Sequence, residues 1–195
     1  MGDTFQIIAD VEAAEAEAAA LAASIVGWLR DAQIIAGQQP GCVLGADAGY
    51  PPGPGYDAAV TDVDELLGGL KVNGLEVTTA RSVFFPGQGE VGPVTCPQCG
   101  RNVELQSQAD GTMTAHWKLF SDAITRWMAK EPNEVACPLC WHPTALNDWH
   151  WSVEWPVAVG FLGFTFWNWP PLNSSFIAQV QEHLGHKIVV IRGKL

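Results

Sequence analysis

Two pairs of cysteines with the same spacing constrain this chain more than any other feature. They lie in the segments Cys96-Pro97-Gln98-Cys99 and Cys137-Pro138-Leu139-Cys140. Two cysteines separated by two residues present both sulfurs on one tight turn, and two such turns supply the four thiolates that zinc prefers in a tetrahedron. The sequence therefore predicts one structural zinc ion per chain. Its predicted ligands are Cys96, Cys99, Cys137 and Cys140.

Both cysteine loops resemble the knuckles of zinc-ribbon proteins. A proline follows the first cysteine of each pair, and Gly100 follows the first pair, as favoured by a turn that directs backbone N–H groups toward sulfur. The resemblance covers Val94 to Asn102 and Val135 to Pro143. The sequence departs from the ribbon pattern in two ways: 37 residues separate the two pairs, and Trp141 stands where glycine is usual.

Two other uses of paired cysteines fit the sequence less well. A thiol–disulfide redox pair normally occurs once, in a β-α-β context, whereas this chain has two pairs. A zinc deaminase requires a proline before the first cysteine and a His-x-Glu triplet upstream, but Thr95 and Ala136 precede the pairs here. Four thiolates also leave a zinc ion no open position for a catalytic water. The predicted metal is therefore structural.

The charge distribution bears on the class of partner. The net charge is −11, and residues 1–70 carry eleven acidic groups against the single base Arg30. Such a surface repels a phosphate backbone and lacks the clustered cations that counterion release requires, which disfavours nucleic-acid binding through a general basic face. An acidic surface is better suited to a basic protein partner.

The sequence gives no sign of export or membrane insertion. The start, Met1 to Phe5, lacks the basic region that opens a secretory signal. Residues 6–35, which are predicted below to form a helix, have Ala18 to Leu29 as their longest uncharged stretch. This stretch is shorter than the about 18–20 residues that a bilayer requires. We therefore predict a cytoplasmic protein with reduced cysteines. Cys42 has no predicted role.

Hydrophobic periodicity predicts an α+β fold with a mixed sheet, packed helices and the cysteine module as an insertion. The N-terminal segment, residues 1–35, is predicted to be a long acidic amphipathic helix, because apolar residues recur at three- and four-residue steps over residues 6–35. This helix is expected to pack on the core or to form a homodimer. Dense glycine and proline predict a linker or extended arm over 36–58. The remaining residues, 59–195, are predicted to form the α+β domain, with the zinc-ribbon-like module at about 94–143.

Within this domain, alternation, capping residues and turn signals predict strands and helices in a definite order. The predicted elements are a short helix from Thr61 to Leu67, a strand from Leu75 to Phe85, a strand from Asn102 to Gln106, a helix from Trp117 to Lys130, a strand from Val157 to Phe166, a helix from Ser175 to Leu184, and a strand from Lys187 to Arg192. A return through a short helix predicts that the last two strands are parallel neighbours.

Possible acid–base groups follow the second cysteine pair. They are His142, Asp148, His150 and Glu154. Two imidazoles and two carboxylates can do proton-transfer chemistry, but alternation favours a simpler interpretation, in which tryptophans form the packed face of a strand and polar residues its wet face. No catalytic residue is therefore assigned. His183 and His186 lie at a helix end, where the helix dipole alone favours histidine.

Three functions remain open. Nine tryptophans and an acidic surface favour a non-catalytic protein-binding module, with aromatic anchors for affinity and charge for steering. Bacterial immunity proteins, which are acidic and neutralise a basic toxin or nuclease, are an analogy based on charge and size. An enzyme using the histidine and carboxylate cluster is the alternative. A zinc-ribbon nucleic-acid factor is the third, and it would use Arg101, Lys118, Arg126 and Lys130.

Overall fold

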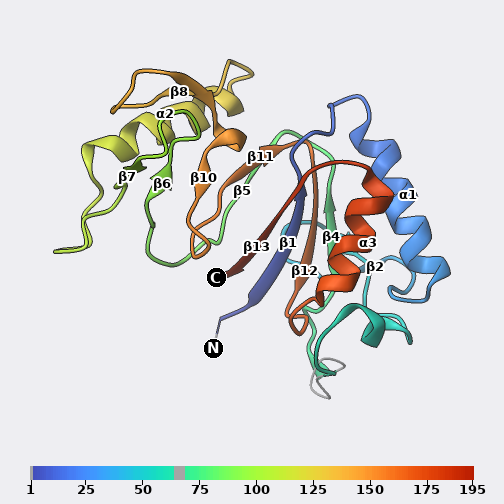
Figure 1. Cartoon of the computed structure of the whole chain (residues 1–195). Helices are drawn as coiled ribbons and strands as arrows, with labels where there is room; N and C mark the ends of the chain where they lie inside the picture. Colours follow the sequence, from blue (N-terminus) through green and yellow to red (C-terminus); the bar gives the residue numbers. More distant parts are fainter. Residues whose placement is uncertain (1, 64–68) are drawn as a thin grey trace.

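A computed structural model describes residues 2–63 and 69–195 of the chain, which form two lobes (Figure 1). The larger lobe is a four-stranded sheet with helices on one face. Its strands are β1 (Thr4–Asp10), β4 (Leu75–Thr78), β12 (Leu162–Trp167) and β13 (Ile188–Lys194). Its helices are α1 (Ala18–Asp31) and α3 (Ser174–Leu184). The smaller lobe contains the four paired cysteines.

The sheet has the order β13-β1-β12-β4, and every neighbouring pair is antiparallel. In the unit β1-α1-β4 the two strands are parallel to each other and β12 lies between them. In the unit β12-α3-β13 the two strands are also parallel, and β1 lies between them. This arrangement is the split β-α-β connectivity. The predicted parallel pairing of the last two strands is wrong because β1 lies between β12 and β13. The sheet is accordingly antiparallel and not mixed.

The prediction of one long N-terminal helix is wrong, because its first part is strand β1. Residues 6–35 do not form one long helix: residues 4–10 are the central strand, and the helix begins at Ala18. Residues 5–10 are all buried because both faces of the strand are covered. Ile8 faces the helices, whereas Phe5 and Ile7 join the cluster on the opposite face. A strand buried on both faces shows a continuous apolar run and no alternation, so its pattern could be assigned to the helix that follows.

Helices α1 and α3 cover one face of the sheet side by side (Figure 1). Helix α1 buries Ala18, Ala22, Ile25 and Leu29 against it. The predicted helix at 175–184 is confirmed: the side chain of Asn173 accepts a hydrogen bond from the Phe176 N–H, and Gly185, at φ 69°, ends the helix. Among the described residues, no helix has the length and hydrophobicity needed to cross a membrane.

The glycine- and proline-rich segment 36–58 packs against the larger lobe. It contains the short strands β2 (Gln39–Pro40) and β3 (Ala48–Gly49) and the 3-10 helix η1 (Tyr56–Ala59). Backbone hydrogen bonds in both directions join Tyr50 to Leu75. Its close approach to other chain segments requires small residues, since a Cβ at Gly53 would lie 2.1 Å from the Gln33 carbonyl oxygen. Most of the short helix predicted from Thr61 to Leu67 falls on residues 64–67, which lie outside the described residues.

Residues 79–161 form an insertion between β4 and β12. Its base is a two-stranded ribbon of β5 (Ser82–Phe84) and β11 (Ala158–Gly160). Each of two predicted strands, 75–85 and 157–166, is thus divided between the sheet and this ribbon. At Gly160 the chain passes so close to the end of β1 that a Cβ would lie 2.5 Å from the Asp10 carbonyl oxygen, and there the chain leaves the sheet.

Beyond the ribbon, the insertion has a hydrophobic core of its own. Its strands are β6 (Val94–Thr95), β7 (Asn102–Val103), β8 (Glu134–Ala136), β9 (Pro143–Ala145) and β10 (His150–Trp151), and its helices are α2 (Ala115–Met128) and the 3-10 helix η3 (Leu146–Asp148). Phe120 of α2 is fully buried, with Trp149 and Trp151 packed edge-on against its ring. Cys96 and Cys137 belong to the same core. The aromatic residues and two of the four paired cysteines thus share one hydrophobic core.

Candidate metal centre

The four paired cysteines converge at one point of the insertion. The sulfur atoms of Cys96, Cys99, Cys137 and Cys140 all lie within 4.8 Å of one another. The Cys96–Cys140 and Cys99–Cys137 sulfur distances are 3.9 and 4.0 Å. In a tetrahedral zinc site, a Zn–S bond of about 2.3 Å places the sulfurs about 3.8 Å apart. The cluster is therefore positioned to bind a metal ion.

Two short β-hairpins hold the cysteines by the same backbone pattern. In the first, between β6 and β7, the Cys96 N–H donates to the Arg101 carbonyl oxygen at 3.0 Å and the Gly100 N–H donates to the Cys96 carbonyl oxygen at 2.9 Å. In the second, between β8 and β9, Cys137 makes the equivalent bonds with His142 and Trp141 at 3.0 and 2.8 Å. The clustering of the four cysteines on two such hairpins is consistent with the predicted zinc-ribbon-like knuckle motif.

Trp141 occupies the position in the second hairpin that Gly100 occupies in the first. Both have a left-handed backbone, with φ 64° for Trp141 and 66° for Gly100. A bulky side chain at such a φ is strained. The Trp141 side chain is nevertheless 78% exposed, so packing of its indole ring does not compensate for the strain. Strained conformations of this kind concentrate at functional sites.

Arg101 provides positive charge beside the cluster. Its guanidinium donates a hydrogen bond to the Leu139 carbonyl oxygen of the other hairpin. The Arg101 backbone N–H and side chain lower the pKa of the Cys99 thiol to about 6. The Leu139 N–H also lies 3.4 Å from the Cys137 sulfur. These donors stabilise negative charge on sulfur, as a thiolate-bound metal requires.

The pKa of the Cys140 thiol is shifted in the opposite direction to that of Cys99. The His142 backbone N–H lowers the pKa of Cys140, but burial and the neighbouring thiols of Cys137 and Cys99 outweigh it and raise that pKa to about 11. Four thiols this close cannot all ionise together, because each thiolate disfavours the next. A divalent cation would remove this conflict, since metal binding displaces the thiol protons. The donor set thus fits a thiophilic metal.

The predicted acid–base cluster is only partly assembled. Asp148 and His150 line a polar cavity of about 430 Å³ together with Glu134, Thr144 and Lys187. His142 and Glu154 are exposed and do not line this cavity. The Thr144 hydroxyl is buried and makes no hydrogen bond among the described residues. The structure therefore brings two of the four candidates together.

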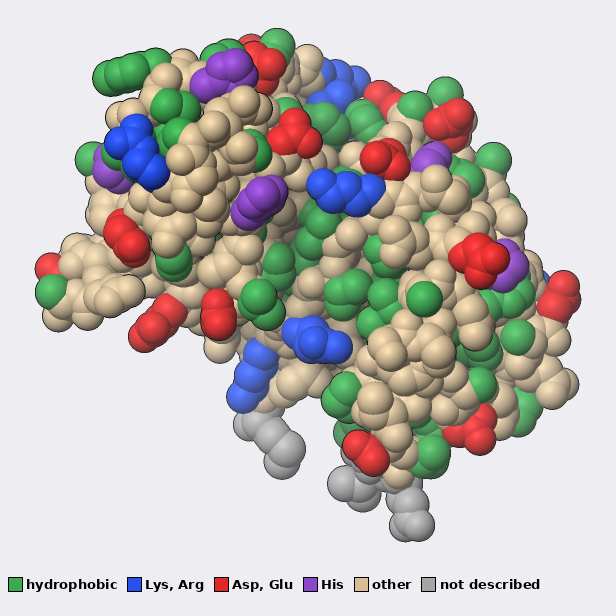
Figure 2. Space-filling model, in the orientation of Figure 1, with side chains coloured by type: hydrophobic (Ala, Val, Ile, Leu, Met, Phe, Trp, Pro, Cys, Tyr) green, Lys and Arg blue, Asp and Glu red, His purple; other side chains and the backbone are tan. Residues whose placement is uncertain are grey.

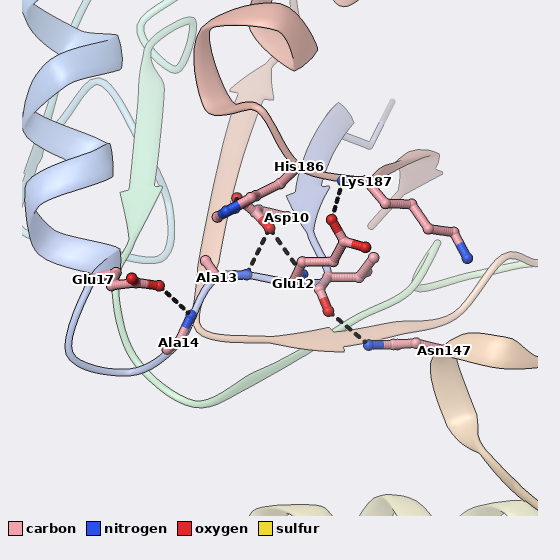
Figure 3. A network of polar contacts seen from close by, with 9 residues as sticks. Asp10, Glu12, Ala13, Ala14, Glu17, Asn147, His186 and Lys187 are labelled. Carbon is pink, nitrogen blue, oxygen red and sulfur yellow. Dashed lines mark hydrogen bonds and ion pairs between the residues drawn. The ribbon is translucent and has the colours of Figure 1, made fainter.

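The other predicted histidines do not meet. His183 packs its ring on Trp28, with 4.2 Å between ring centroids, whereas His186 Nδ1 lies 2.9 Å from a carboxylate oxygen of the buried Asp10 (Figure 3). The second oxygen of Asp10 accepts hydrogen bonds from the backbone N–H groups of Glu12 and Ala13. Over the described part of the chain, the four cysteines are the only cluster of His, Cys, Asp or Glu with metal-binding spacing.

The basic residues considered for nucleic acid are mostly engaged locally. Lys118 pairs with Asp122 at 2.7 Å, and Arg126 donates to the carbonyl oxygens of Pro132 and Glu134. Arg101 serves the cysteine cluster, as described above. On the face shown in Figure 2, basic side chains occur in small groups among acidic and hydrophobic ones.

Comparison of the chain with protein-family models, with curated proteins and with solved structures yields no match. Function is therefore inferred from the site and not from the fold, because one fold hosts many unrelated activities.

Sequence reasoning missed two features. One is the pair of Asp10 and His186, whose members lie 176 positions apart and meet only because β1 and β13 are neighbours. The other is an apolar cavity beside Arg81. The only sequence signal for it was a single base among aromatic residues, which many surfaces share.

Proposed function

We propose that this chain is a non-catalytic protein-binding module in which one structural zinc ion holds Trp141 exposed for recognition of a partner. The observation that carries the proposal is the exposed, left-handed Trp141 in the second cysteine hairpin. Tryptophan supplies a large amount of apolar contact area and is the residue most enriched among binding hot spots. Glycine would satisfy the backbone at this position at lower cost, so the indole ring itself is the feature that needs a function.

Zinc is the metal that the donors favour. Four sulfurs at tetrahedral spacing suit zinc, and four protein ligands leave the ion no site for a substrate. Bound zinc would fix both hairpins relative to each other, and so would fix the backbone that carries Trp141. The ion thus supplies rigidity, and rigidity reduces the entropy lost when a partner binds.

Charge favours a basic protein as the partner. The acidic excess of residues 1–70 would attract a basic partner over a distance of about 8–10 Å at physiological salt. Binding of this kind combines steering by charge with affinity from an aromatic anchor. An acidic immunity-type protein that neutralises a basic toxin or nuclease is one specific case. Cytoplasmic location and dimerisation through α1 remain predictions.

The alternatives have weaker support. An enzyme that uses the predicted cluster would lack His142 and Glu154 in its cavity. A nucleic-acid factor would depend on Lys118 and Arg126, which are engaged in local contacts. Protein binding through Trp141 requires neither that His142 and Glu154 move into the cavity nor that Lys118 and Arg126 leave their local contacts.

The test separates folding from recognition. Zinc per chain is measured on the wild type, on Cys96→Ser and on Trp141→Gly, and each protein is then immobilised to capture partners from its native host. We expect one zinc in the wild type and in Trp141→Gly, and loss of zinc in Cys96→Ser. A basic protein retained by the wild type and lost with Trp141→Gly supports the proposal. Equal retention by both proteins, or a zinc-free wild type with Cys–Cys disulfides, overturns it.

A further inference from the structure

Strand β13 forms one edge of the sheet in the larger lobe, because β1 is its only neighbour. A strand at an edge presents backbone groups with which another extended chain can pair, and alternate residues direct theirs to opposite sides. The Val11 N–H donates to the Lys187 carbonyl oxygen at 3.2 Å. At the other end, the Leu195 N–H donates to the Asp3 carbonyl oxygen at 2.9 Å. Odd-numbered residues thus face β1, and the backbone groups of the even-numbered ones face outward: Ile188, Val190, Arg192 and Lys194.

In the described part of the chain, only the last of these outward positions is paired. The Lys194 N–H donates to the Pro86 carbonyl oxygen at 3.1 Å, and the Lys194 carbonyl oxygen accepts from the Gln88 N–H at 3.2 Å. The other three positions make no such bond with residues 2–63 or 69–195, and none of the three is buried. Residues 188–192 therefore form an open edge, long enough for a short strand of about 3–5 residues.

The open edge, residues 188–192, borders the space between the two lobes (Figure 1). In the same orientation, Figure 2 shows the surface hollowed between the lobes, with hydrophobic side chains in the hollow and basic ones beside them. The open edge has the sequence Ile-Val-Val-Ile-Arg. Strands pair well when apolar β-branched residues face one another, so an added strand should be apolar in its middle.

The strand is basic, although the protein as a whole is acidic. Residues 187–194 contain three bases and no acid, namely Lys187, Arg192 and Lys194, and all three are exposed. None of them forms an ion pair with a carboxylate of residues 2–63 or 69–195. Opposite charges on facing residues of neighbouring strands are favourable, whereas like charges are unfavourable. An added strand is therefore favoured if it carries carboxylates opposite these bases.

A second copy of β13 fits this edge poorly. Antiparallel pairing about Val190 would place Arg192 of each copy opposite Ile188 of the other. Residues 187–194 of the two copies would then bring six bases and no acid into one ribbon. Charges of one sign on edge strands oppose such self-association.

We propose that the open edge binds an acidic, extended segment of another protein, which adds to the sheet as a fifth strand. The backbone groups of Ile188, Val190 and Arg192 would supply the hydrogen bonds, as in other cases of strand addition. The bases of β13 would select carboxylates at the ends of the segment. This surface lies on the larger lobe and involves neither Trp141 nor the cysteine cluster.

The first test uses blocked peptides on the wild-type, zinc-loaded protein. The probe, acetyl-TETVTVE-amide, places its central valine opposite Val190 and its two glutamates opposite Arg192 and Lys187. We expect saturable binding with a dissociation constant below about 1 mM at low salt. N-methylation of the central valine, whose N–H would face β13, should weaken binding about tenfold. N-methylation of the threonine that follows it, whose N–H would face away, should leave the affinity unchanged. No saturable binding, or equal affinity of the two methylated peptides, overturns the proposal.

The second test locates the peptide and examines its charge. Amide exchange followed by NMR should slow at the outward N–H groups of Ile188, Val190 and Arg192 when the peptide binds, and unchanged exchange there overturns the proposal. Replacing both glutamates by lysine should weaken binding about tenfold. Arg192→Glu should reduce this preference, whereas Lys130→Glu, the same charge change at another exposed base, should not. A dimer in sedimentation that the peptide dissociates would assign the edge to a second copy and overturn the proposal.

Discussion

At the scale of single residues, Trp141 has an energetic cost that can be measured. A non-glycine residue in the left-handed region costs about 1–2 kcal/mol, and the exposed indole ring recovers little of this by packing. We expect Trp141→Gly to raise the free energy of unfolding of the zinc-loaded protein by about 1 kcal/mol. Denaturant unfolding checks this, with Gly100→Ala as the reverse substitution in the first hairpin, which should destabilise. A clear loss of stability in Trp141→Gly would show that the ring is structural.

A second residue-scale prediction concerns pH. Hydrogen bonding to Asp10 raises the pKa of His186 above its ordinary 6.5, with the nearby charges of Asp10, Glu12 and Glu17 adding to the effect against burial. Because the folded-state pKa is the higher one, this pair stabilises the fold fully below pH 6.5, and the stabilisation is lost as pH rises through the folded-state value. Unfolding followed between pH 5 and pH 8 should show this decline in the wild type and in His183→Gln, and a flatter profile in His186→Gln. An unchanged slope in His186→Gln would contradict the assignment.

At the scale of elements, Asn147 of η3 joins the insertion to the sheet. Its side-chain amide donates to the Val159 carbonyl oxygen at 2.7 Å and to the Val11 carbonyl oxygen at 3.5 Å, and its oxygen accepts from the Val159 N–H at 2.9 Å. Removing these bonds would leave polar backbone groups of β11 without partners. We expect Asn147→Ala to destabilise the protein by about 2 kcal/mol. Thermal unfolding checks this, and Asn102→Ala in the exposed part of β7 is the control with little effect.

The elements also show what the sequence could and could not predict. Helix α3 was predictable because Asn173 and Gly185 mark its ends locally, and the cysteine hairpins were predictable because metal chemistry dictates their spacing. Strand β1 was missed since a strand covered on both faces lacks the alternation by which strands are recognised. The order of the sheet was missed with it, because placing β1 between β12 and β13 needs contacts between the two ends of the chain. Trp141 was visible as a departure from the knuckle pattern, but its exposure was not.

At the scale of the whole molecule, the two lobes have separate hydrophobic clusters, which predicts separate responses to metal removal. A chelator should unfold the insertion, because each thiolate disfavours ionisation of its neighbours and, once the metal is removed, no ion holds the two hairpins together. The sheet, whose core does not include the cysteines, should persist. Hydrogen exchange read by mass spectrometry should show loss of protection within residues 92–151 and retained protection in β1 and β12. Simultaneous loss in both lobes would show that they form one cooperative unit.

The insertion enters and leaves through the paired strands β5 and β11, so its two ends are adjacent where they join the sheet (Figure 1). A segment with adjacent ends can be gained or lost by one recombination event without reordering the strands of its host. The split β-α-β sheet and the cysteine module can therefore have separate evolutionary origins. Relatives of residues 79–161 and relatives of the remaining residues need not be the same proteins.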